Sequence, residues 1–231
     1  MFERTESAYL GAYWGDRAES VASCAERLAT CIAGLAAVSD TASGWRSKGR
    51  SPSDGAPLGV DVGTLVEALL AGVNRRDIGG EPIPRLGYRW SAWNGRSAAS
   101  MSMSVTCGAF AAERGVLNAF VLDFPDRDGG EAATSVYDGA EALLSEVVRA
   151  WEPEWALVTS HPIRTMLGAP ANEPGVGWLT YLAPSRPIEA LGRPLAGGRL
   201  FRVADRWEDV SDEDVRHLYD DLTAAGVMSR A

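Results

Sequence analysis

The chain contains only two histidines, which limits the nucleophilic chemistry that its sequence can support. His161 directly follows Ser160 in the stretch TSHPIR, and a hydroxyl with an imidazole base is the pair that many hydrolases use. His217 lies in an acidic C-terminal segment, and the chain lacks the GxSxG motif that exposes a nucleophilic serine. A small hydrolase of unassigned type using His161 therefore remains an alternative, while a loop histidine bonded to the backbone is the favoured interpretation.

Motifs that would hold a phosphate, a cofactor or a metal ion are missing from the sequence. The glycine-rich stretches 175–178 and 196–198 do not open a helix after a strand, so their amides would not converge on a phosphate. Cys24, Cys31 and Cys107 form no CxxC pair and do not have the spacing of zinc ligands. We expect buried, reduced thiols, and neither a cofactor nor a metal.

Charge is the strongest local signal. The net charge of −9 disfavours direct binding to nucleic acid or to an anionic membrane. It fits a basic protein partner or simply solubility, which is the more common reason for such a charge. Residues 205–221 hold eight carboxylates against two arginines. Three of these acids fall in the expected first turn of a helix, where the helix dipole alone would explain them. The candidate partner-binding residues are Asp205, Glu208, Asp209, Asp212, Glu213 and Asp214.

Tryptophan beside glycine is a recurring pattern in this chain. Trp14, Trp93 and Trp178 each lie within two residues of a glycine, near the end of an expected strand. Such rings could form a platform for a peptide, which would make the protein an adaptor. Rings that fold over a glycine and close the end of a sheet are the favoured interpretation.

The order of the expected elements predicts an α+β fold. Residues 100–107 alternate between apolar and polar side chains, which is typical of an antiparallel strand with one wet face. Helices are expected to begin at Asp16 and Asp138, each followed three residues later by a glutamate as in a capping box, and near Ser211. We expect one domain over residues 1–231, with helices packed on a largely antiparallel sheet. The expected strands are 7–14, 86–95, 100–107, 116–125, 154–160, 175–183 and 198–205.

The N-terminus and the length of the apolar runs indicate where in the cell the protein is expected. The first nine residues, MFERTESAY, are charged and lack the apolar stretch of a secretory signal. No apolar run approaches the ~20 residues that span a bilayer. We therefore expect a cytoplasmic protein without a membrane contact.

Seven short motifs occur in an order that resembles the immunity protein 52 family of bacterial polymorphic toxin systems. The similarity runs from about residue 9 to residue 205, and the acidic C-terminal helix matches least well. The motifs are YWGDRAES, WRSKGRS, GVNRRD, LGYRWSAWNG, YDGAE, VVRAWEPEWALVTS and VGWLTYL.

This resemblance implies a cytoplasmic α+β protein that is encoded beside a toxin and is not an enzyme. The family's toxins carry a restriction-endonuclease-like nuclease domain, so the expected function is to bind and neutralise that domain. The resemblance supplies no catalytic residues; Val136 and Asp138 depart from the family pattern. The positions that recur in the family, as structural or binding residues, include Trp14, Gly15, Arg17, Trp45, Trp93, Asn94, Gly95 and Trp178.

Overall fold

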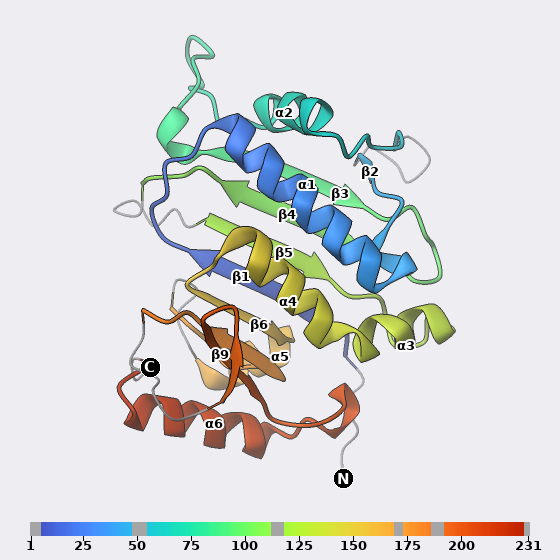
Figure 1. The fold of residues 1–231 in the computed structure, drawn as a ribbon, viewed down its shortest axis with the longest axis vertical. Helices are drawn as coiled ribbons and strands as arrows, with labels where there is room; N and C mark the ends of the chain where they lie inside the picture. The colour runs from blue at the N-terminus through green and yellow to red at the C-terminus, as the bar shows by residue number, and fades with distance from the viewer. Residues whose placement is uncertain (1–5, 48–54, 112–117, 169–172, 186–191, 229–231) are drawn as a thin grey trace.

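A single antiparallel sheet runs through the part of the chain that the computed structural model describes, residues 6–47, 55–111, 118–168, 173–185 and 192–228. Within these residues nine strands pair in the order β2-β3-β4-β5-β1-β6-β7-β9-β8 (Figure 1). The first strand in sequence therefore lies at the centre of the sheet. The strands are β1 (Tyr9–Trp14), β2 (Arg46–Ser47), β3 (Tyr88–Trp93), β4 (Ser102–Cys107), β5 (Asn118–Asp123), β6 (Trp155–Thr159), β7 (Leu179–Leu182), β8 (Arg193–Leu195) and β9 (Gly198–Arg202).

Three helices form a layer on one face of the sheet. Helix α1 lies between α2 and α4, and α4 contacts the central strands β1 and β6 (Figure 1). Helices α5 and α6 contact each other at the β9 end of the molecule. The fold class predicted from the sequence, a single α+β domain with a largely antiparallel sheet, is confirmed. The helices are α1 (Val21–Val38), α2 (Val62–Ala71), α3 (Gly130–Asp138), α4 (Ala140–Trp151), α5 (His161–Leu167) and α6 (Asp212–Ala224).

Alternation along β1 directs its side chains to the two faces of the sheet. Trp14 faces the helical layer and stacks on Trp151 of α4, with ring centroids 5.2 Å apart. Tyr13 faces the opposite side and stacks on Trp155 of β6 at 4.1 Å. Burial raises the pKa of Tyr13 to about 12.

Strand β4 shows the alternation that its sequence predicts. Met103, Val105 and Cys107 are buried, and Ser104 between them is exposed. All three cysteines are buried and free, and burial raises the pKa of the Cys31 thiol to about 12. The expectation of buried, reduced thiols is confirmed.

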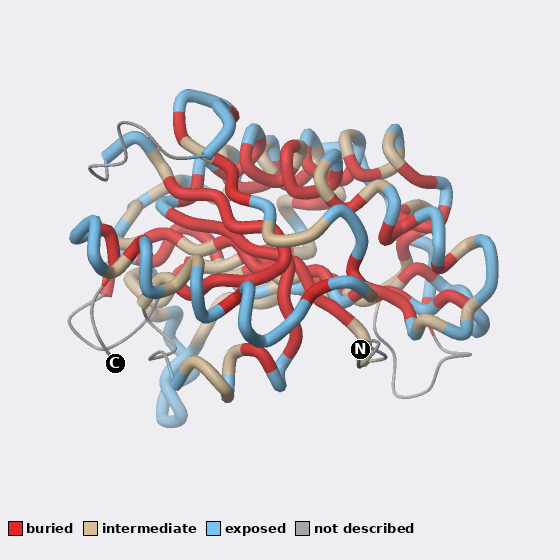
Figure 2. The backbone as a smooth tube through the Cα atoms, turned by 90° about the horizontal axis from the view of Figure 1, so that it is seen from below, coloured by how far each residue is buried: buried red, intermediate tan, exposed pale blue. Residues whose placement is uncertain are grey.

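The second face of the sheet is covered unevenly. Helix α5 lies over its central part, where the His161 ring is 5.2 Å from Tyr9 and the Arg164 guanidinium is 5.9 Å from the Trp155 ring. Figure 2 shows the buried segments concentrated in the strands and on the inner sides of the helices. Arg89 and Ser104, on strands β3 and β4, are exposed on this second face.

Helix α1 is long and apolar enough to cross a membrane by length and composition, which the search for apolar runs in the sequence did not anticipate. In the fold it is the middle helix of the layer. Its inner side is fully buried against the sheet and the neighbouring helices, as in the core helix of a globular domain. The buried residues are Cys24, Ala25, Leu28, Cys31, Ile32 and Leu35.

Two helix starts differ from the sequence prediction. Ser20, not Asp16, caps α1, because its hydroxyl accepts a hydrogen bond from the Ser23 amide at 3.1 Å. Asp138 is the last residue of α3 rather than the cap of α4, which begins after Gly139 without a side-chain cap. The prediction that the last helix begins at Ser211 is confirmed.

Four short elements were not predicted. Helix α3 occupies much of a segment expected to be a loop, and α5 begins directly after β6 despite a proline in its first turn. Strands β2 and β8 have only two and three residues, too few for a periodic pattern to reveal. Strands β2 and β8 extend the sheet at its two edges.

Candidate functional site

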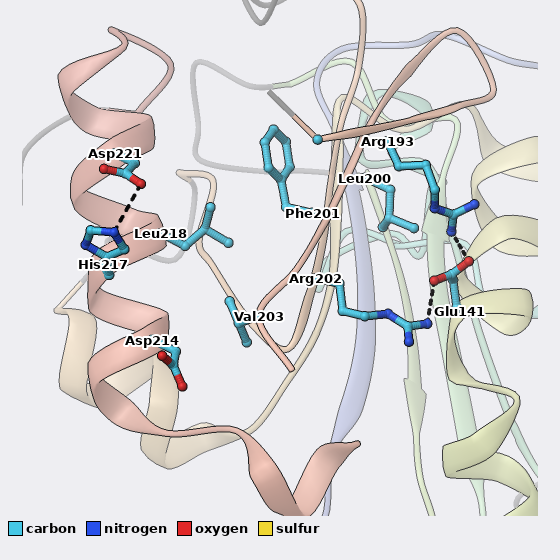
Figure 3. A pocket seen from close by; sticks show the side chains of 11 residues that line it. Glu141, Arg193, Leu200, Phe201, Arg202, Val203, Asp214, His217, Leu218 and Asp221 are labelled. Carbon is cyan, nitrogen blue, oxygen red and sulfur yellow. Dashed lines mark hydrogen bonds and ion pairs between the residues drawn. The ribbon is translucent and has the colours of Figure 1, made fainter. Parts of the chain in front are cut away.

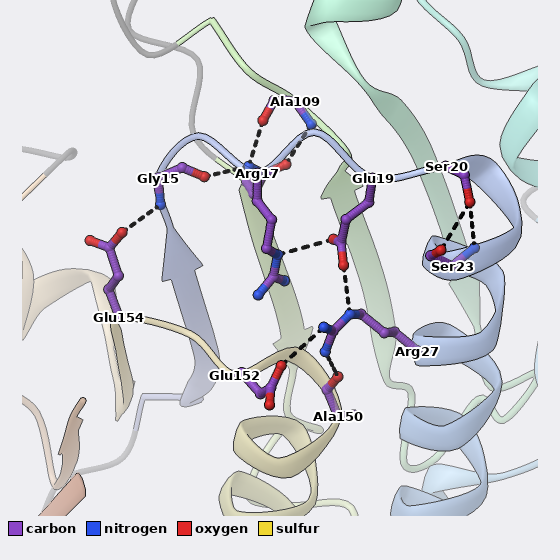
Figure 4. Close-up of polar contacts among 11 residues, drawn as sticks. Gly15, Arg17, Glu19, Ser20, Ser23, Arg27, Ala109, Ala150, Glu152 and Glu154 are labelled. Carbon is purple, nitrogen blue, oxygen red and sulfur yellow. Dashed lines mark hydrogen bonds and ion pairs between the residues drawn. The ribbon is translucent and has the colours of Figure 1, made fainter. Parts of the chain in front are cut away.

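The junction between β1 and α1 is built as a structural corner (Figure 4). Trp14 is buried, and the Arg17 guanidinium lies 4.8 Å from its ring centroid. The Gly15 amide donates to the Glu154 carboxylate at 3.1 Å, and the Asn118 side chain donates to the Gly15 carbonyl at 2.6 Å. The three family positions in this corner therefore fix the turn that connects the sheet to the helical layer.

Glu19 is the centre of an ion-pair network at the same corner (Figure 4). Its carboxylate accepts from Arg17 at 3.0 Å and from Arg27 of α1 at 2.7 Å. Arg27 also donates to the Ala150 carbonyl and pairs with Glu152, both at 2.9 Å. The network joins the ends of α1 and α4, which explains why Glu19 does not serve in a capping box.

The positions around β2 and the end of β3 also have structural partners. Asn94 is only 3% exposed, and its amide group donates to the carbonyls of Thr41 and Ala99. Its side-chain oxygen accepts from the Met101 amide at 3.0 Å. Gly95 has a φ of +72°, a conformation that glycine adopts without strain. Asn94 and Gly95 therefore shape the connection between β3 and β4.

The tryptophans differ in exposure. Trp45 and Trp178 are buried, and their indole N–H groups donate to the carbonyls of Ala42 and Ala204. Trp93 is half-buried at the end of β3, on the less covered face of the sheet. Of the three rings expected to close the ends of the sheet, Trp14 and Trp178 are buried as that interpretation requires, whereas Trp93 is only half-buried.

Ser160 and His161, the pair of the hydrolase alternative, form no hydrogen bond with each other. Ser160 is buried and caps α5, accepting from the Ile163 amide at 3.4 Å and donating to Glu6 at 3.0 Å. His161 is exposed and lines neither the cavity between β9 and α6 nor the one beside Tyr137 and Trp178. It is the first residue of α5 rather than a loop residue, so the expectation of a loop histidine was wrong.

The six candidate acidic residues gather along the segment that leads from β9 through the short turn Trp207–Asp209 into the first turn of α6. Five are exposed, but the Glu208 side chain is only 11% exposed and pairs with both Arg127 and Arg206. Ser211 caps α6 by accepting from the Asp214 amide at 3.0 Å, and it donates to the Asp214 carboxylate at 2.6 Å. We call this exposed set, Asp205, Asp209, Asp212, Glu213 and Asp214, the acidic surface.

A cavity of about 720 Å³ lies between β9 and α6 (Figure 3). Phe201 and Leu218 form part of its apolar wall, and Glu141 at the start of α4 pairs with Arg193 and Arg202. His217 lies 3.7 Å from Asp221 on the exposed side of α6. The described lining residues include no serine, threonine or cysteine, so this cavity supplies no side-chain hydroxyl or thiol for covalent catalysis.

Among the residues that the structure describes, no group of three or more histidine, cysteine, aspartate or glutamate side chains could hold a metal ion. Most polar side chains at the candidate positions cap helices, form ion pairs with one another or bond to the backbone of loops. Together these features describe an α+β protein in which most of the sequence-predicted positions hold the structure together.

The chain belongs to the immunity protein 52 family (Imm52), whose sequence profile matches residues 6–196. This confirms the family that the seven motifs predict. The matched range ends before β9, so the acidic surface and the whole of α6 lie outside it. No protein with curated annotation is detectably similar in sequence.

Solved structures share the fold at low sequence identity. The Pseudomonas aeruginosa T6SS protein PA0821 superposes with a TM-score of 0.54 and 14% identity. The match covers 96% of this chain and 76% of that one. At this identity the likeness shows the fold alone.

Proposed function

We propose that this protein is a cytoplasmic immunity protein that binds a cognate toxin of a polymorphic toxin system and neutralises it. The observation that carries the proposal is its membership of the immunity protein 52 family over residues 6–196. The fold supports it, because the functional positions suggested by the sequence are mostly used to hold the structure together. We propose no catalytic residue, cofactor or resident metal.

The proposed toxin carries a nuclease domain. A nuclease must hold phosphate groups, so its substrate-binding surface presents lysine, arginine or a metal ion. A chain with a net charge of −9 is attracted to such a surface and is repelled by the nucleic acid itself. The acidic surface is the densest part of this negative charge, and we propose that it speeds the approach of the toxin.

Co-expression with the toxin encoded by the adjacent gene tests the proposal. Cells that express the toxin alone should stop growing and show degraded chromosomal DNA, and cells that also express this protein should grow. The two proteins should co-purify, and association should slow as salt concentration rises. The matched control is a catalytically inactive toxin, which should bind equally well. Continued growth arrest despite abundant folded protein would contradict the proposal.

A toxin without nuclease activity would contradict only the proposal that the toxin is a nuclease. If the protein rescues growth while the toxin leaves DNA and RNA intact, the immunity function stands and the nuclease assignment fails. The hydrolase alternative predicts instead that His161→Ala abolishes protection while the variant stays folded.

A further inference from the structure

A hairpin-like arm connects α2 to β3. The Ile83 amide donates to the Asn74 carbonyl at 2.7 Å, and the Arg76 amide donates to the Glu81 carbonyl at 2.8 Å. A bridge pairs Arg75 with Pro82. We call residues 74–83 the arm. Figure 1 shows that it stands out beyond the helical layer, at the end of the molecule opposite α6.

The arm ends in a turn that places an apolar side chain in water. Gly79 and Gly80 have φ values of +85° and +64°, which favour glycine. Ile78 is 91% exposed, the most exposed large apolar residue that the structure describes. The turn itself needs glycine and not isoleucine, so the fold gives no reason for this side chain.

Single exposed apolar residues are common and mean little by themselves. Here they are not scattered. Among the described residues the other large apolar side chains that are exposed lie in or beside α2, except Phe110, whose amide donates at 3.0 Å to the Arg85 carbonyl below the arm. The set is Val60, Val62, Leu70, Ile78 and Phe110. Apolar exposure is thus concentrated at the end of the molecule that carries the arm.

Two arginines accompany Ile78 on the arm. Arg75 donates to the Gly80 carbonyl at 3.1 Å, which holds its guanidinium beside the tip. Arg76 lies 3.7 Å from Glu81, and both side chains are more than half exposed. The arm contains two arginines and two acids and is therefore neutral, in a chain of net charge −9. Arginine beside an apolar anchor is typical of the residues that dominate binding energy in protein interfaces.

We propose that the arm is the anchor of the toxin complex: Ile78 enters an apolar pocket on the toxin domain, and Arg75 and Arg76 face carboxylates at its rim. The inference rests on the proposed function and names the surface that performs it. The arm lies within the residues that match the family, whereas the acidic surface lies outside them. The arm is held by backbone hydrogen bonds in the free protein, so little ordering is needed on binding.

Binding of arm variants to the inactive toxin domain encoded by the adjacent gene tests this inference. Ile78→Ser should weaken affinity at least ~30-fold, mainly through faster dissociation, because a buried anchor is lost. Ile78→Leu keeps the apolar volume and should bind nearly as wild type does. Arg75→Glu with Arg76→Glu should weaken affinity at least ~10-fold by placing carboxylates against carboxylates.

Two controls distinguish the loss of the anchor from general effects of charge or stability. Arg216→Glu makes the same kind of charge change on the exposed side of α6 and should alter affinity by no more than about twofold at physiological salt. Thermal unfolding should be unchanged for Ile78→Ser, since its side chain contributes little buried area. Growth rescue by wild type with unchanged affinity of Ile78→Ser would overturn the inference and leave the proposed function intact.

The same variants would also reveal whether the arm binds a partner other than the toxin. If light scattering shows that the wild type is a dimer that Ile78→Ser dissociates, while toxin affinity per monomer is unchanged, the arm binds a second copy and the inference fails. If wild type neither rescues growth nor binds the toxin domain, the proposed function itself has failed.

Discussion

At the β2 edge of the sheet, α2 and the arm expose isoleucine, leucine and valine side chains, whereas at the β8 edge α6 buries its apolar residues and exposes carboxylates. The two edges are eight strand spacings apart, about 40 Å at ~4.8 Å each. A standard interface of about 800 Å² per partner is roughly 30 Å across. Figure 1 places the arm and α6 at opposite ends of the molecule, so one compact toxin domain bound at the arm leaves α6 uncovered.

The two ends differ in how far the fold itself explains their exposed side chains. At the acidic end, Glu208 pairs with two arginines, and the acids at the start of α6 lie where a helix dipole favours them. At the arm, nothing in the turn requires Ile78. A surface feature that the fold does not use is the better guide to a partner, which is why we place the anchor at the arm.

The largest effect is expected for a core residue of α6. Leu222 is fully buried, and Leu222→Ala should lower the free energy of unfolding by about 2–4 kcal/mol through lost burial and a residual cavity. Urea unfolding measures the change, and Leu222→Met is the volume-conserving control. If the two ends act separately, toxin affinity should be unchanged below the unfolding transition. A parallel loss of affinity would show that the α6 end takes part in the complex.

A smaller effect is expected from a matched pair of acidic residues. Glu208→Gln removes the charge that pairs with Arg127 and Arg206, and should lower the free energy of unfolding by about 1–3 kcal/mol. Asp205→Asn removes the same charge from an exposed site and should change it by less than ~0.5 kcal/mol. Neither should alter toxin dissociation. Equal destabilisation of both variants would contradict the distinction between an ion-paired and an exposed carboxylate.

The smallest effect is expected at the acidic surface. Reversing Asp209, Asp212 and Glu213 to lysine should slow association a few-fold at ~10 mM salt, where the Debye length is about 30 Å, and little at ~150 mM, where it is about 8 Å. Stopped-flow measurements at both salt concentrations give the rates, with Ile78→Ser measured alongside. If the triple variant instead dissociates at least ~10-fold faster at both, the toxin docks on the acidic surface and not on the arm.

Periodic patterns made much of the fold predictable. The period-two alternation of β4 and the helical spacing of α1 are long enough to identify each element without knowing its neighbours. The cap of α1 was missed because Glu19 has partners that the local sequence does not reveal: Arg27 lies eight residues away, on the helix. Helix α5 was missed because Pro162 suggested a break, although proline is tolerated in a first turn.

The candidate site was predictable only in part. The acidic residues do gather on one surface, since they are close in sequence and most lie on or beside one helix. The sequence did not reveal that Glu208 pairs with Arg127, because Arg127 lies 81 residues earlier in the chain. The paired glycines 79 and 80 signal a turn. The residues on either side of these glycines pair with each other and project from the molecule because of the positions of α2 and β3. The sequence pattern does not reveal those positions.

The central position of β1 has a consequence for synthesis. Tyr9 pairs with Asp123 on one side and with Thr159 on the other, so the first strand to leave the ribosome must wait for strands made more than a hundred residues later. At ~10 residues per second that delay is roughly 15 s. A cell relying on this protein for protection would need a standing stock of finished chains before its toxin is translated, because half-made copies cannot close the middle of the sheet.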